Sequence, residues 1–169
     1  MGTTALISEE TYRRSSYDPD CEYADGVLIE RNSGEQDHSW LQGALTAWFF
    51  NRRKVWGIEV FPEQRHFIRK GRYMIPDVCV IRSPRPIEKV FDKPPLIWIE
   101  ILSAEDRPIR VNEKIRELRE FGVPNIWVID PETFEAEIHT PEGTSTIEDG
   151  VLRVPGTPIE VPLRTLDRD

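Results

Sequence analysis

The sequence predicts an α/β fold in which helices flank a mixed central β-sheet. Two short apolar runs, residues 75–81 and 96–102, are typical of neighbouring strands joined by a proline-rich loop, and such neighbours most often pair antiparallel. A third run at 125–130 comes after a helical pattern, and a strand, a helix and a strand in that order predict a parallel pair. One sheet would then contain both kinds of pairing.

A hairpin, a long helix and an extended segment are predicted before these strands. Asp25-Gly26 lies between two short runs in residues 20–31, as in a β-hairpin. In residues 36–54 the apolar side chains recur at the spacing of one helical face: Leu41, Ala44, Leu45, Trp48 and Phe49. Residues 55–68 read as extended, and Pro62 near their middle favours an edge strand or a bulge.

The remaining elements are a second helix and short strands. Residues 110–121 form an amphipathic pattern that ends at Gly122, a residue typical of helix C-caps. Candidate strands follow at 136–139, 144–147 and 151–154. We expect the proline-rich C-terminal segment to lie over the surface. The expected organisation is one domain over residues 1–169, with 1–10 and 163–169 peripheral.

Charge, apolar runs and cysteine content limit the kinds of partner and the cellular location that we expect for this protein. A net charge of −8 argues against a protein that coats nucleic acid through a general positive field. It does not exclude nucleic acid, because a site that holds metal ions needs acidic groups and a local basic patch can still contact phosphates. No apolar run is long enough to span a bilayer and no leader precedes the domain, so we expect a soluble, cytoplasmic protein without a membrane partner. Cys21 and Cys79 are expected to be reduced.

Glu100 interrupts the apolar run 96–102, where an unpaired carboxylate would be costly. A register that sets Ile81 opposite Leu96 also sets Asp77 opposite Glu100. Both carboxylates would then lie at one end of the sheet, although a slip of one residue would turn a side chain to the opposite face.

Lys114 is the charged residue of helix 110–121 that falls inside its apolar stripe, when residues are placed at about 100° intervals. An ammonium directed at the sheet needs an anion, and Asp77 and Glu100 are the nearest candidates. Two carboxylates can hold a divalent cation while a lysine orients or deprotonates a water that attacks a phosphodiester. A structural Glu100–Lys114 ion pair without catalysis is the alternative.

A series of motifs points the same way, taken in chain order: Glu22, Asp25-Gly26, His38, Pro76-Asp77, Glu100-Ile101-Leu102-Ser103, Lys114, Gly122-Val123 and Trp127-Val128-Ile129-Asp130-Pro131. Together they resemble the Uma family, a bacterial group within the PD-(D/E)XK, restriction-endonuclease-like superfamily, over roughly residues 10 to 165. The resemblance implies a restriction-endonuclease-like sheet with additional β-hairpins. It also implies hydrolysis of DNA phosphodiester bonds with Mg²⁺ or Mn²⁺.

The resemblance also assigns roles. Asp77 and Glu100 would be the metal-binding acids, with the Ile101 carbonyl as a further ligand, and Lys114 would be the catalytic lysine. In the wider superfamily this lysine lies two residues after the glutamate, a position that Leu102 occupies here. Leu118 stands where the family commonly has a tyrosine.

The resemblance extends to two residues near the N-terminus. Glu22 would match an acid that serves a second metal or a water, and an exposed hairpin residue is the alternative. His38 would match a histidine at the start of the long helix, where it continues the buried face, and a helix-terminal or core histidine is the alternative. His66 and His139 are interpreted as ordinary surface residues.

The sequence therefore predicts a metal-dependent endonuclease that acts on DNA. The alternative is a catalytically inactive nuclease-like scaffold that binds nucleic acid or a protein partner. The net negative charge, the lack of a recognisable DNA-reading module and Leu118 favour this alternative. A homodimer would suit symmetric cutting, which needs two sites.

Overall fold

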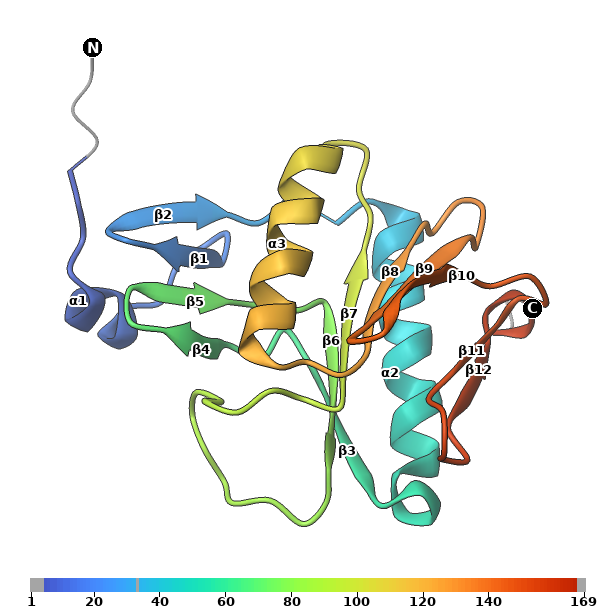
Figure 1. Ribbon diagram of the computed structural model, residues 1–169. Helices are drawn as coiled ribbons and strands as arrows, with labels where there is room; N and C mark the ends of the chain where they lie inside the picture. The colour runs from blue at the N-terminus through green and yellow to red at the C-terminus, as the bar shows by residue number, and fades with distance from the viewer. Residues whose placement is uncertain (1–4, 33, 167–169) are drawn as a thin grey trace.

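The computed structural model describes residues 5–32 and 34–166 and contains a mixed central sheet with helices on both faces (Figure 1). Its helices are α1 Glu9–Arg14, α2 Gln36–Trp56 and α3 Pro108–Phe121, with a 3-10 turn η1 at Leu163–Thr165. Its strands are β1 Cys21–Ala24, β2 Val27–Glu30, β3 Ile58–Pro62, β4 His66–Arg69, β5 Arg72–Met74, β6 Val78–Arg82, β7 Ile97–Ile101, β8 Ile126–Ile129, β9 Ala136–Thr140, β10 Gly143–Thr146, β11 Val151–Arg153 and β12 Glu160–Pro162.

The central sheet has the strand order β10-β9-β8-β7-β6-β3. β6 and β7 pair antiparallel with Val78 opposite Ile99, which is the predicted register, and β7 and β8 pair parallel. The predicted mixed α/β sheet is therefore confirmed. β3 lies at the edge of this sheet, as Pro62 indicates, since a proline there has no N–H to donate to a further strand.

The two long helices cover opposite faces of the central sheet (Figure 1). Leu41, Leu45 and Phe49 of α2 pack against alternate residues of β7, including Ile99. Ile115 and Leu118 of α3 belong to a second cluster, which contains Trp98 of the same strand. Because side chains alternate along a strand, Glu100 lies on the face of β7 that carries Trp98 and α3.

A second sheet, of order β2-β1-β5-β4, extends beyond α3 (Figure 1). Its β1–β2 hairpin turns at Asp25-Gly26 as predicted, with both turn residues at positive φ. Residues 55–68 do not form one extended segment. Helix α2 continues to Trp56 and ends at the left-handed Gly57, after which β3 and β4 enter different sheets.

The C-terminal segment corrects one prediction. Residues 159–166 do not lie over the surface, because Ile159, Val161 and Leu163 point inward at every second position and Leu166 is also buried. They join β11 in the core that α2 covers. Residues 1–4 and 167–169, parts of the segments expected to be peripheral, lie outside the described residues.

Two histidine predictions are also wrong. The His66 ring is buried against Phe91 and Trp98, and His139 is buried with its Nδ1 2.9 Å from Thr144 Oγ1. An extended segment gives no sign of which of its faces is covered, and here both rings lie on covered faces. Cys21 and Cys79 are free, buried thiols, as expected. In the part of the chain that the structure describes, no helix is long and apolar enough to cross a membrane.

Candidate active site

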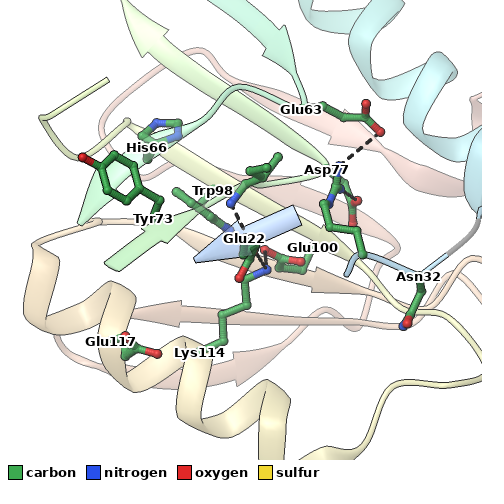
Figure 2. A network of polar contacts seen from close by, with 12 residues as sticks. Glu22, Asn32, Glu63, His66, Tyr73, Asp77, Trp98, Glu100, Lys114 and Glu117 are labelled. Atoms are coloured by element: carbon green, nitrogen blue, oxygen red, sulfur yellow. Dashed lines mark hydrogen bonds and ion pairs between the residues drawn. The ribbon is translucent and has the colours of Figure 1, made fainter. Parts of the chain in front are cut away.

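A cavity of about 630 Å³ lies between α3, the β1–β2 hairpin and the adjoining ends of β6 and β7. Its lining includes the predicted site residues Glu22, His38, Asp77, Glu100, Ile101 and Lys114. Figure 2 shows Lys114 reaching from α3 toward Glu22 and Glu100. The fold thus brings every predicted site residue to one pocket.

Asp77 is placed at this pocket by the β6–β7 register. It directly precedes β6, and its backbone N–H donates to the Ile99 carbonyl at 3.1 Å. Asp77 Oδ2 accepts a 2.7 Å hydrogen bond from the backbone N–H of Ile101 and lies 3.3 Å from His38 Nε2. Its Oδ1 lies 2.6 Å from an Arg31 nitrogen. The carboxylate is therefore contacted on both oxygens.

These contacts set the charge of Asp77. Burial by itself would raise the pKa of Asp77, but the hydrogen bond from His38 and the charge of Arg31 outweigh it and hold that pKa below its usual value. The same hydrogen bond raises the pKa of His38, against the opposing effect of burial. At neutral pH Asp77 is ionised.

Glu100 occupies a different environment on the neighbouring strand. Its Oε1 accepts a hydrogen bond from Trp98 Nε1 at 2.6 Å and lies 2.7 Å from Lys114 Nζ. Burial raises the pKa of Glu100 to about 7, with Lys114 opposing the shift and the charges of Asp77 and Glu22 adding to it. Glu100 is therefore poised to exchange a proton near neutral pH, whereas Asp77 is not.

Glu22 is buried, which excludes the alternative that it is an exposed residue of the hairpin. Its Oε1 accepts from the Ile75 N–H at 3.0 Å and lies 2.9 Å from Lys114 Nζ, while Oε2 lies 3.3 Å from Arg72. Burial would raise the pKa of Glu22, but Lys114 and Arg72 hold it below the usual value. The ionised form of Glu22 is therefore favoured in the pocket.

Lys114 lies inside the apolar stripe of α3 and points at the sheet, as the sequence predicts. Its two anions are Glu100 and Glu22, however, and not the predicted pair of Glu100 and Asp77. Burial opposes the charged form, but these two carboxylates overcome it and raise the pKa of Lys114. Lys114 is therefore an ammonium in this arrangement, suited to stabilising negative charge and to orienting a water.

Three residues of the site were missed by the sequence argument: Arg31, Arg72 and Trp98. Arg72 on β5 contacts Glu22 and also pairs with Glu117 of α3 through two nitrogens, which ties the second sheet to the helix that carries Lys114. Trp98 lies two residues before Glu100, so a shared strand face was a usable signal. For Arg31 and Arg72 the sequence offers no comparable spacing.

The oxygen donors of the pocket suit a hard divalent cation such as Mg²⁺ or Mn²⁺. Asp77 and Glu100 could hold such an ion, and Glu100 Oε2 accepts none of the hydrogen bonds found within the described ranges. No group of three or more His, Cys, Asp or Glu side chains among the described residues is arranged to hold a metal ion. The acids are instead neutralised by protein cations, which an ion would have to replace at Asp77.

Comparisons with known proteins agree with the fold. The family model Uma2, described as "Putative restriction endonuclease", matches residues 9–164. A solved structure described as "a putative nuclease belonging to DUF820 from Anabaena variabilis ATCC 29413" superposes with a TM-score of 0.81 at 22% identity, covering 95% of this chain and 97% of that one. A DrdV–DNA complex matches with a TM-score of 0.43 at 15% identity over 63% of this chain and 10% of that one, which is too weak to carry an argument. No curated protein matches the chain.

Proposed function

Because the chain belongs to the Uma2 family of restriction-endonuclease-like proteins, we propose that it hydrolyses phosphodiester bonds of DNA with the help of a divalent cation. The observation that carries this proposal is the meeting of Glu22, Asp77, Glu100 and Lys114 in one pocket. A structural ion pair needs one acid and one base. Here three acids meet the cations Lys114, Arg72 and Arg31 in one pocket, and Glu22 and Glu100 share the lysine ammonium.

In the proposed reaction Asp77, Glu100 and the Ile101 carbonyl would hold Mg²⁺ or Mn²⁺. A bound ion of this kind polarises a phosphoryl oxygen and lowers the pKa of a bound water. Lys114 offsets the negative charge that develops on the phosphoryl oxygens and orients the attacking water. Glu22 holds the Lys114 ammonium in place, and Arg72 in turn holds Glu22. His38 supports the ionised form of Asp77.

Incubation of the purified protein with supercoiled plasmid and Mg²⁺ or Mn²⁺ tests this proposal. We expect nicking or cutting that EDTA abolishes and that is lost in Asp77→Asn. The matched control is Asp149→Asn, since Asp149 is an exposed acid paired with Arg153. Thermal melting of each variant shows whether it is folded. Cleavage by a folded Asp77→Asn protein would contradict the proposed mechanism.

The second candidate, a nuclease-like scaffold that binds DNA or a protein without cutting, is favoured by one observation. Every buried acid of the pocket already has a protein cation, so the fold does not need a metal for charge balance. Calorimetric titration with Mn²⁺ separates the two candidates. Binding that is lost on Glu100→Gln supports the enzyme, and no binding of Mn²⁺ or Mg²⁺ supports the scaffold.

A further inference from the structure

Arg31 is a second cation inside the proposed metal site, and the family resemblance assigns it no role. It directly follows β2, and its side chain is 17% exposed. One terminal nitrogen lies 2.6 Å from Asp77 Oδ1, and the other lies 3.3 Å from Glu63 Oε1. The guanidinium therefore bridges a buried acid and an acid that is 53% exposed.

The Arg31 contact has a consequence for metal binding. The Ile101 N–H and His38 already contact Asp77 Oδ2, which leaves Oδ1 as the oxygen for a metal ion. Arg31 contacts this Oδ1. A divalent cation at this oxygen would meet a guanidinium of like charge at hydrogen-bond distance. The ion and the Arg31 guanidinium therefore cannot both lie against Asp77 Oδ1.

We propose that Arg31 is an internal competitor for the divalent cation at Asp77: it neutralises the carboxylate in the metal-free protein and releases Oδ1 when the ion binds. The inference rests on the proposed metal site. Lys114 does not play this part, because it contacts Glu100 at Oε1, the oxygen that Trp98 also holds, and Glu22 contacts it as well.

Glu63 makes this exchange feasible. It is the second partner of Arg31, so the guanidinium keeps a carboxylate when it leaves Asp77. Gln42 donates to Glu63 Oε1 at 3.3 Å and to the Asp77 carbonyl at 3.0 Å, which holds Glu63 beside the site. Arg31 can therefore shift between two neighbouring anions without becoming an unpaired charge.

Titration calorimetry with MnCl₂ in the absence of DNA tests the proposal. Methionine in Arg31→Met keeps an unbranched side chain, shorter than that of arginine, and removes the competing charge. A charge-assisted hydrogen bond contributes enough that its removal should tighten Mn²⁺ binding by about 10- to 100-fold. Arg31→Lys should lie between Arg31→Met and the original protein. Arg65→Met is the matched control, since Arg65 is 18% exposed, pairs with Asp20 and does not line the cavity, and its Mn²⁺ affinity should be unchanged.

Thermal melting supplies a second readout that does not depend on activity. Arg31→Met should melt below the original protein without metal, because Asp77 loses a partner, and should gain a larger rise in Tm from Mn²⁺. If Arg31→Met has a lower Tm but an unchanged or weaker affinity for Mn²⁺, Arg31 is a structural partner only and the proposal is overturned.

Glu63→Gln approaches the same question through an exposed residue, whose substitution leaves the core intact. Without Glu63, Arg31 should stay on Asp77, so Mn²⁺ should bind several-fold more weakly. In the Arg31→Met background the same substitution should have little effect. Equal effects in both backgrounds would overturn the exchange and indicate a simple loss of negative charge.

The results also separate this inference from the proposed function. Metal-dependent cleavage together with equal Mn²⁺ affinities of Arg31→Met and the original protein would overturn the role of Arg31 alone. An absence of Mn²⁺ binding in every variant would overturn the proposed metal site and, with it, the competition.

Discussion

Trp98 and Glu100, two residues apart on β7, share a hydrogen bond of 2.6 Å from the indole Nε1 to the carboxylate Oε1. The indole is fully buried, so it holds one oxygen of Glu100 in a fixed position from within the core. Lys114 contacts the same oxygen from the helix side. Glu100 is thus oriented by two donors on Oε1, which leaves Oε2 as the oxygen for a ligand in the pocket.

Trp98→Phe should therefore weaken the site as well as the fold. The substitution removes the N–H donor and part of a buried ring, which we expect to cost about 1 to 3 kcal/mol of unfolding free energy. Glu100 gains freedom to rotate, so Mn²⁺ affinity and any cleavage should also fall. Urea unfolding and Mn²⁺ calorimetry measure the two effects.

Trp127→Phe is a matched control for this experiment. Trp127 is equally buried, but its Nε1 has no hydrogen-bond partner within the described part of the chain. The control should lose stability through the smaller ring alone and keep its Mn²⁺ affinity. If both variants lose the same Mn²⁺ affinity, the Trp98 N–H does not position Glu100.

Lys114→Met should leave a folded but less stable protein. Methionine fills a similar space, but Glu22 and Glu100 lose the ammonium that both contact. Removing one partner from a largely buried pair costs about 3 kcal/mol. Lys93→Met is the control, and it should leave the stability unchanged because Lys93 is exposed. Urea denaturation near neutral pH compares the two, and a Lys114→Met protein as stable as the original would show that the lysine does not stabilise the two acids.

The part of this site that the sequence predicts is the part that depends on local periodicity. The register of β6 and β7 follows from two apolar runs joined by a loop, and it places Asp77 beside Glu100. The position of Lys114 follows from the stripe of α3. Both predictions depend on the spacing of apolar residues within one or two elements.

The partners of these residues depend on packing between distant elements. Glu22 reaches Lys114 because the second sheet lies against α3, where Arg72 and Glu117 join them. No pattern within β1 or β5 reports that arrangement. Arg31 directly follows β2 and contacts Asp77, which lies 46 residues further along the sequence. Such contacts are set by the tertiary structure and leave no periodic trace.

Leu163→Ala tests the corrected position of the C-terminal segment. Leu163 is fully buried in the core beneath α2, so its truncation should leave a cavity and cost about 2 to 5 kcal/mol. Leu6→Ala is the control, because Leu6 is 73% exposed and its loss should have little effect. Thermal and urea unfolding report both. If Leu163→Ala left the unfolding free energy unchanged, the segment would not be part of the core, and the surface position predicted from its prolines would hold.

The raised pKa of Glu100 predicts a specific dependence of stability on pH. Burial shifts this pKa from 4.5 to about 7, so between these values the folded chain keeps a proton that the unfolded chain has released. The contribution of Glu100 to the free energy of unfolding therefore falls as pH rises through this window. Asp77 and Glu22 have lowered pKa values and act oppositely, since their contributions are lost as pH falls below the ordinary carboxylate range.

Glu100→Gln isolates the Glu100 contribution, because it removes one titrating group and leaves Asp77 and Glu22 in place. In EDTA, the stability of the original protein relative to Glu100→Gln should decline from about pH 5 to about pH 8, by at most about 3 kcal/mol. Urea unfolding at several pH values gives this difference directly. A difference that is constant across the window would mean that Glu100 is ionised throughout, and Lys114 would then outweigh burial in setting its charge.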